Sequence, residues 1–217
     1  MWAIVTAAGW PIWPLIFASI IALAIVIERV HALRAEPLFP KNLIEEACKT
    51  PALFKDANNL ARLKAHSALG SILASGYAAA YAGGAWSEAM DDAAAQVQRN
   101  MAKHLDLLSL IASAAPLMGL LGTVVGMIEI FAVQGAASQT PESLASGIAV
   151  ALYNTAFGLM VAIPALVAYR LLRLRIETLL NRLEVQLEPF EGLARQIAAA
   201  SSGTRRVSKT RSEEARP

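Results

Sequence analysis

Residues 112–131 read ASAAPLMGLLGTVVGMIEIF, an apolar stretch long enough to cross a lipid bilayer as an α-helix. Its small residues recur at steps of three, four and seven, which places them along one stripe of a helix. Such a stripe lets another helix backbone approach closely, which is how helices associate in lipid, where burial of apolar surface gives no net drive. The stripe therefore predicts a tightly packed membrane helix, and its members are Ala112, Gly119, Gly122, Thr123 and Gly126.

A second hydrophobic stretch, residues 145–169, repeats this design. Its small residues also fall on one helical stripe, which again contains a single threonine: Ala151, Thr155, Gly158 and Ala162. The two stretches together predict a pair of closely packed helices, each of which places one hydroxyl at membrane depth.

The composition of the chain is that of a membrane protein. Of its 217 residues, 56% are hydrophobic, which is too many for an ordinary soluble domain. The chain has one cysteine, Cys48, so a disulfide framework and a cysteine metal cluster are excluded. We interpret this cysteine as a free thiol in a reducing compartment.

The positive charges are distributed in blocks. Residues 1–28 contain no Lys or Arg, residues 29–103 contain nine, residues 104–169 contain none, and residues 170–217 contain the remaining ten of the nineteen. The positive-inside rule therefore predicts that the two charged blocks are cytoplasmic and that the N-terminus lies outside. Three membrane crossings satisfy this pattern.

We therefore predict an all-α fold: a polytopic membrane protein with three transmembrane helices, in which long helices extend into the cytoplasm. The predicted segments are an external N-terminus with the first transmembrane helix (1–34), a cytoplasmic helical segment (35–106), the second transmembrane helix (107–133), a periplasmic loop (134–142), the third transmembrane helix (143–172), a cytoplasmic helical extension (173–200) and a disordered tail (201–217).

The cytoplasmic segment gives no sign of an enzyme. Its Ala-rich pattern predicts helices around 41–48, 52–80 and 86–106. It contains no Gly-rich phosphate loop, no HExxH motif and no Ser/His/Asp set with suggestive spacing. We therefore expect no catalytic residues, and we expect no nucleic-acid partner. A metal site is not expected either, because the three histidines are isolated from one another: His31, His66 and His104.

The two threonines are predicted to lie at similar depths. Thr123 is about ten residues, and Thr155 about thirteen, from the outer end of its helix, or roughly 15 and 20 Å at 1.5 Å per residue. From spacing alone, the favoured interpretation is that each hydroxyl bonds back to a carbonyl of its own helix.

Three blocks of the sequence resemble the MotA/TolQ/ExbB proton-channel family, and most closely its ExbB/TolQ branch. The blocks are WPLIFASIIALAIVIERVHALR (13–34), APLMGLLGTVVGMIEIF (115–131) and GIAVALYNTAFGLMVAIPALVAY (147–169). They are similar to the first helix with its exit, to the second-helix motif and to the third-helix motif, in matching order.

The resemblance implies a homopentamer in the bacterial inner membrane, with a periplasmic N-terminus and a cytoplasmic C-terminus. Its second and third helices would line a pore that holds a single-span ExbD/TolR-like partner, whose aspartate titrates. The complex would use proton-motive force to energise TonB-dependent outer-membrane transport, with a TonB-like protein as a further partner and no cofactor. Protons are the expected coupling ion, and sodium stays open. The alternatives are a TolQ-like Tol-Pal motor, another surface motor, and a non-conducting scaffold.

The resemblance also implies roles for single residues. Thr123 and Thr155 become pore-facing hydroxyls opposite the partner's carboxylate, and Asn154 is a polar substitution beside them. The family glutamate of GIAEAL is replaced by Val150 in GIAVAL, which leaves the proton-carrying role to the partner. We interpret Glu129 as an interfacial residue. The expected helix-packing and kink residues are Pro116, Gly119, Gly122, Gly126, Gly158 and Pro164.

Overall fold

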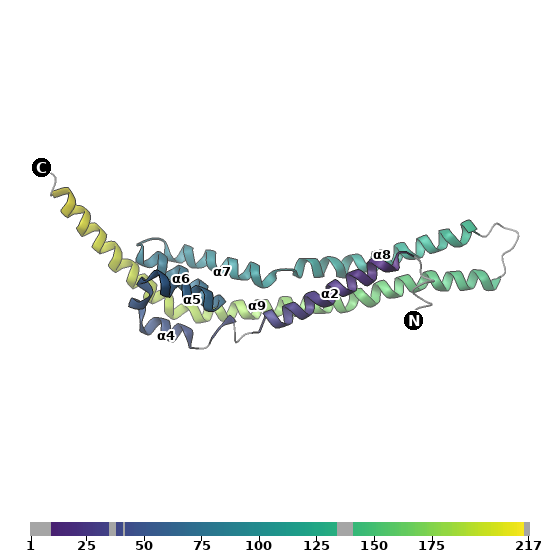
Figure 1. Ribbon diagram of the computed structural model, residues 1–217, viewed down its shortest axis with the longest axis horizontal. Helices are drawn as coiled ribbons and strands as arrows, with labels where there is room; N and C mark the ends of the chain where they lie inside the picture. Colours follow the sequence, from purple (N-terminus) through teal and green to yellow (C-terminus); the bar gives the residue numbers. More distant parts are fainter. Residues whose placement is uncertain (1–9, 35–37, 41, 134–140, 215–217) are drawn as a thin grey trace. The chain divides into compact units, whose positions relative to one another are not determined.

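The computed structural model describes residues 10–34, 38–40, 42–133 and 141–214, and every regular element in these ranges is a helix (Figure 1). Three helices are long and apolar enough to cross a membrane, which confirms the predicted fold class. The elements are α2 (Ile12–Ala32), α4 (Leu43–Lys49), the 3-10 helix η1 (Pro51–Lys55), α5 (Ala57–His66), α6 (Ala68–Tyr81), α7 (Trp86–Ala102), α8 (Leu105–Val133) and α9 (Pro141–Glu214).

The chain divides into two compact units, which we describe separately. Unit 1 comprises the described parts of Met1–His31 and Ala102–Leu174. Unit 2 comprises the described parts of Ala32–Met101 and Arg175–Pro217. Unit 1 holds α2, α8 and the first part of α9, whereas unit 2 holds α4 to α7 and the remainder of α9.

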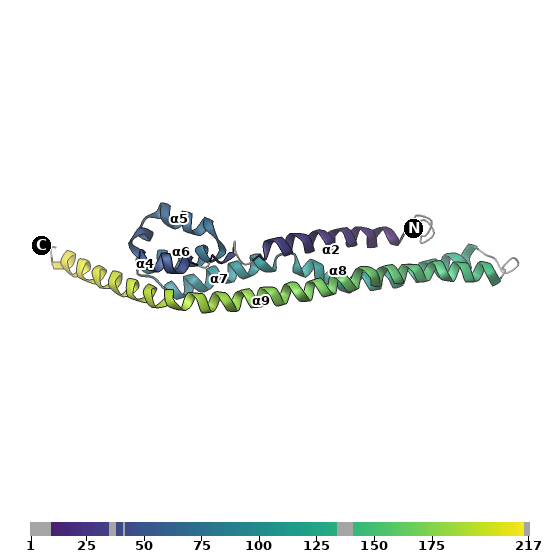
Figure 2. The same ribbon diagram turned by 90° about the horizontal axis from the view of Figure 1, so that it is seen from below.

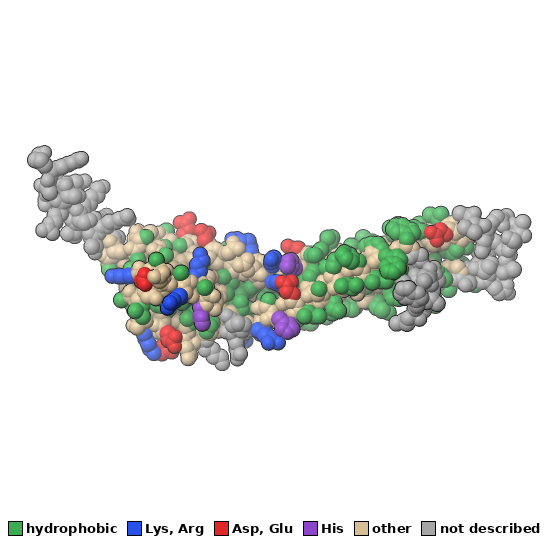
Figure 3. Space-filling view, in the orientation of Figure 1, with side chains coloured by type: hydrophobic (Ala, Val, Ile, Leu, Met, Phe, Trp, Pro, Cys, Tyr) green, Lys and Arg blue, Asp and Glu red, His purple; other side chains and the backbone are tan. Residues whose placement is uncertain are grey.

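In unit 1, α8 and α9 run side by side in opposite directions (Figures 1 and 2). The helix α2 packs on both of them through a small apolar core that contains Leu15 from α2, Ala115 from α8 and Ala162 from α9, all buried. Hydrophobic side chains also cover much of the outer surface of this unit in Figure 3. Phe17 and Leu117, for example, are each 67% exposed, as expected for helices that face lipid or other subunits.

In unit 2, the core is built around Tyr77 on α6. Its ring stacks on Phe54 at a centroid distance of 4.9 Å and meets the edge of Phe190, from α9, at 4.7 Å. Its hydroxyl donates a hydrogen bond of 2.7 Å to the carbonyl oxygen of Ala47 at the end of α4. Tyr77 therefore joins three helices and the 3-10 turn with one side chain, and its buried hydroxyl is satisfied.

The predicted single helix over residues 52–80 is wrong, because two capping residues divide it. Asp56 and Ser67 both have extended backbones, and each side chain accepts a hydrogen bond from an amide of the helix that follows. The Ser67 hydroxyl accepts from the Gly70 amide at 3.0 Å. Such caps satisfy amides that have no partner within the helix, so they stabilise new helix starts where periodicity alone suggested continuity.

The predicted helix over 86–106 is also divided. The helix α7 ends at Ala102, and α8 begins at Leu105 after His104, whose φ is 64°. A residue with this left-handed backbone cannot continue a right-handed helix.

The third long helix continues into its predicted helical extension. The helix α9 runs without interruption from Pro141 to Glu214, so residues 201–214, which were predicted as part of a disordered tail, are helical as well. Arg, Lys and Glu in this region favour helix, and extension of an existing helix costs little. Residues 215–217, residues 1–9, which were predicted to be external, and most of the predicted loop, 134–140, lie outside the described residues.

Candidate functional site

The interface between α8 and α9 is formed by backbone contacts at glycine. A β-carbon placed on Gly119 would lie 2.7 Å from the carbonyl oxygen of Asn154 and 3.0 Å from the Cα of Thr155. A β-carbon on Gly158 would lie 2.6 Å from the carbonyl oxygen of Ala115. Because these neighbours are backbone atoms, they cannot move aside for a side chain. The small residues of the two predicted stripes therefore face each other.

The same close approach continues along both helices. At Gly122 a β-carbon would lie 2.7 Å from the Cβ of Asn154, and at Gly126 it would lie 3.3 Å from the Cβ of Ala151. The side chain of Asn154 thus fits against α8 only because position 122 has no side chain. Asn154 is 1% exposed, which makes it a rare fully buried polar residue among the described positions.

The two threonines that were predicted as site residues, Thr123 and Thr155, lie beside this interface. Thr123 is half-buried, and its hydroxyl donates a hydrogen bond of 2.7 Å to the carbonyl oxygen of Leu120, three residues earlier in α8. Thr155 is also half-buried, with its Cα against Gly119. Thr123 therefore makes the intrahelical type of bond that its spacing predicts, and this bond leaves the hydroxyl oxygen able to accept a further hydrogen bond.

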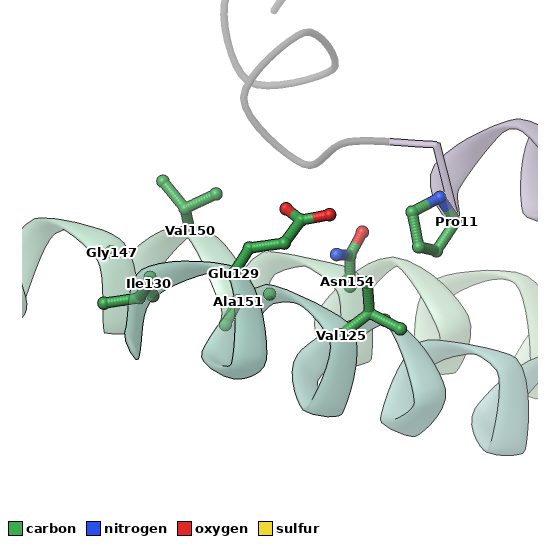
Figure 4. Close-up of a pocket in the computed structure, with 10 residues that line it drawn as sticks. Pro11, Val125, Glu129, Ile130, Gly147, Val150, Ala151 and Asn154 are labelled. Atoms are coloured by element: carbon green, nitrogen blue, oxygen red, sulfur yellow. The ribbon is translucent and has the colours of Figure 1, made fainter. Parts of the chain in front are cut away.

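A cavity of about 240 Å³ lies between the C-terminal half of α8 and the N-terminal half of α9 (Figure 4). The side chains of Glu129 from α8 and Asn154 from α9 reach into the same space, which Pro11 borders on one side. The other lining residues are apolar or glycine: Gly122, Val125, Gly126 and Ile130 from α8, and Gly147, Val150 and Ala151 from α9.

Some of the predicted site residues line the cavity, and others do not. It brings Asn154 and Val150 together, whereas Thr123 and Thr155 are not among the residues that line it. Glu129, interpreted from sequence as interfacial, lies on its wall. The sequence contained a signal for this position, because Glu129 follows Gly122 by seven residues and so continues the small-residue stripe of α8.

The predicted kink residues lie inside continuous helices. Pro116 lies within α8 and Pro164 within α9. Each proline lacks a backbone N–H, so the carbonyl four residues earlier has no helical donor from it. The helices continue in spite of this, as is common where neighbouring helices pack closely in a membrane.

A polar cluster joins the end of α2 to the start of α8. The carboxylate of Glu28 pairs with the Arg29 side chain and also lies 3.0 Å from Nδ1 of His104. Arg29 is 6% exposed, so its charge is held within unit 1 beside an opposite charge. In the part of the chain that the structure describes, no three His, Cys, Asp or Glu side chains gather in a metal-binding arrangement.

The MotA/TolQ/ExbB proton channel family matches residues 64–185, which is more than half of the chain and includes all of α8. The chain is 34% identical over 184 residues to biopolymer transport protein exbB1 of Vibrio cholerae, a match that covers 81% of this chain and 80% of that protein.

Two shorter similarities point to the same group of proteins. The chain is 42% identical over 81 residues to the Tol-Pal system protein TolQ of Haemophilus influenzae, with 37% of this chain and 36% of that protein covered. It is 39% identical over 79 residues to biopolymer transport protein ExbB of Aquifex aeolicus, with 36% of this chain and 53% of that protein covered.

Proposed function

The chain belongs to the MotA/TolQ/ExbB proton channel family, and we propose that it is the channel subunit of an ion-driven motor. It is a multi-pass protein of the inner membrane. In this proposal it uses proton-motive force, together with an ExbD/TolR-like single-span partner, to energise TonB-dependent outer-membrane transport. The similarity to a biopolymer transport protein over most of both chains supports this output.

The observation that carries the proposal is the paired structure of α8 and α9. Two helices that are long and apolar enough for a membrane bury the amide of Asn154 against Gly122 and line a cavity that a carboxylate enters. Polar groups at bilayer depth are costly, so helices retain them mainly where they face a water-filled path or a polar partner. A helix pair that served only as a membrane anchor would need none of these groups.

In the proposed assembly, five copies surround a pore lined by α8 and α9. Thr123 and Thr155 face the partner's carboxylate, and Asn154 adds a buried polar group at the same interface. The proton is the proposed coupling ion, with sodium as the alternative. The distribution of Lys and Arg supports a periplasmic N-terminus and a cytoplasmic C-terminus.

A Tol-Pal type of output is the second candidate. The similarity to TolQ of Haemophilus influenzae favours it, but that match covers 37% of this chain, compared with 81% for exbB1 of Vibrio cholerae. A non-conducting scaffold is the candidate from a different class, and the apolar Val150 at the position of the family glutamate favours it.

Native mass spectrometry of the complex, extracted mildly from its own cells, tests the assembly. We expect five copies of the chain with a small single-span protein that carries an intramembrane aspartate. A monomer, or a pentamer without such a partner, would contradict the proposed motor.

Ion flux through the purified complex in liposomes tests the activity. We expect proton flux from the wild-type complex and its loss in Thr155→Ala, with the assembly intact. Thr50→Ala is the matched control, because this exposed threonine bonds to a carbonyl of its own segment in unit 2. A wild-type complex that assembles but conducts neither protons nor sodium would support the scaffold instead.

A further inference from the structure

The carboxylate of Glu129 and the carboxamide of Asn154 converge because α8 and α9 are antiparallel. Side chains on an α-helix lean toward its N-terminus. Glu129 therefore leans along α8 toward Val125, and Asn154 leans along α9 toward Val150. Figure 4 shows the result: the carboxylate extends over α8 toward the amide, and both groups enter one cavity.

The cavity offers this carboxylate few polar neighbours among the described residues. Of the described residues that line it, Glu129 is the one with a titratable side chain, and Asn154 is the other with a polar side chain. A volume of about 240 Å³ has room for several water molecules at roughly 30 Å³ each. Glu129 is exposed, so its carboxylate can reach water and exchange protons with it, whereas a carboxylate sealed in lipid would be held neutral.

Position 150 lies on the wall of the same cavity. The resemblance of GIAVAL to the motif GIAEAL implies a glutamate there, on α9, and this chain has Val150. Glu129 brings a carboxylate into that space from α8 instead (Figure 4). The cavity of this chain therefore has one carboxyl group among its described lining residues, and α8 supplies it.

We propose that Glu129 is a proton-binding residue of the ion pathway and supplies, from α8, the carboxyl group of the cavity that Val150 lines from α9. This inference rests on the channel function proposed above. The carboxylate takes up one proton from cavity water and later releases one proton to water beside Asn154, so each cycle leaves the chain unchanged. One carboxylate and one carboxamide suit a proton better than a hard metal cation such as Ca²⁺ or Mg²⁺, which takes about six or more oxygen ligands.

Proton flux through the whole complex in liposomes tests the proposal with three variants. Glu129→Gln keeps the size of the side chain and removes its titration, so flux should fall about 100-fold, as for loss of a positioned proton-transfer group. Asp106→Asn makes the same change in the first turn of α8, away from the cavity, and should leave flux unchanged. The double variant Glu129→Gln/Val150→Glu returns a carboxyl group to the cavity and should restore most of the flux.

The outcomes separate this inference from the channel function. If the wild type conducts protons and Glu129→Gln conducts them equally well, the role of Glu129 is refuted and the channel function stands. If the wild type conducts nothing, the channel function fails, and the inference fails with it. A flux that requires sodium would overturn the assignment of the proton.

A measurement on the wild-type complex avoids any dependence on variant folding. An apolar carbodiimide reacts with protonated carboxyl groups, so peptide mass spectrometry should find Glu129 labelled, with a labelled fraction that falls as the pH rises. Asp106 in the same helix is the internal control and should be labelled less. Labelling of Glu129 that is absent, or equal to that of Asp106, would refute the proposal.

Discussion

A β-carbon built on Gly158 of α9 would lie 3.1 Å from the Cα of Gly119 on α8, so the two helices touch through these glycines. At such a contact the backbones pack directly, which supplies van der Waals energy where lipid gives no hydrophobic drive. Asn154 and Thr155 lie just before Gly158 in α9, so the glycines also determine how close both polar residues come to α8.

Substitution of either glycine by alanine should separate the helices. We expect Gly119→Ala and Gly158→Ala each to lower the free energy of unfolding in detergent by about 1–3 kcal/mol, as overpacking does elsewhere. Gly192→Ala in the same α9 is the matched control, since nothing lies within 4 Å of a β-carbon there. It should be neutral or stabilising by about 0.5–1 kcal/mol. Equal effects at the three positions would contradict the backbone contact.

The left-handed backbone of His104, with a φ of 64°, predicts that a glycine variant at this position is more stable than an alanine variant. Both His104→Gly and His104→Ala remove the contact with Glu28, so the difference between the two variants isolates the backbone. We expect the glycine variant to be the more stable by about 1 kcal/mol. At Lys103, which lacks a positive φ, the order should reverse. Thermal unfolding of the four variants checks both orders, and the same order at both positions would be evidence against the left-handed backbone.

Removal of the Tyr77 hydroxyl should destabilise the core of unit 2. In Tyr77→Phe the carbonyl oxygen of Ala47 loses its 2.7 Å hydrogen bond while the ring contacts stay. An unsatisfied buried group costs about 1–3 kcal/mol, which chemical denaturation can measure. Tyr153→Phe is the control, because that ring is 44% exposed, and it should change stability by less than about 0.5 kcal/mol. A Tyr77→Phe variant as stable as the wild type would show that the bond contributes nothing.

The same tyrosine should make stability depend on alkaline pH. Burial raises the pKa of the Tyr77 phenol, with smaller contributions from Cys48 and Tyr81. The unfolded chain therefore loses this proton first, at about pH 10, and the free energy of unfolding should fall as the pH rises beyond that point. Unfolding curves from about pH 9 to 11 should show a shallower decline for Tyr77→Phe. An equal slope in the two proteins would refute this linkage.

Cys48 should be a slow nucleophile in the folded protein. It is a free, half-buried cysteine, and burial raises the pKa of its thiol. Because the thiolate is the reactive form, alkylation near neutral pH should be several-fold slower than in the urea-unfolded chain. The rate should continue to rise with pH beyond the range in which the unfolded chain levels off. Superimposable pH–rate profiles for the two states would contradict this.

The tertiary structure differs from the sequence-based prediction mainly where a single residue divides a predicted helix. The helix predicted over 52–80 is divided at Asp56 and Ser67, and the one over 86–106 is divided at His104. Polar residues at helix starts are visible in a sequence, but many such residues do not cap. Whether Ser67 adopts an extended backbone depends on how α5 and α6 pack, and no local pattern specifies that packing.

The amino-acid sequence by itself determined the helical class, the three apolar segments and the small-residue stripes of α8 and α9. These follow from hydropathy and from the 3.6-residue period, which are properties of consecutive residues. Only the tertiary structure decided which stripe positions meet, that Asn154 packs on Gly122, and that Glu129 and Val150 share a cavity. Those relations depend on the register of two antiparallel helices, and register is set by packing between residues far apart in the chain.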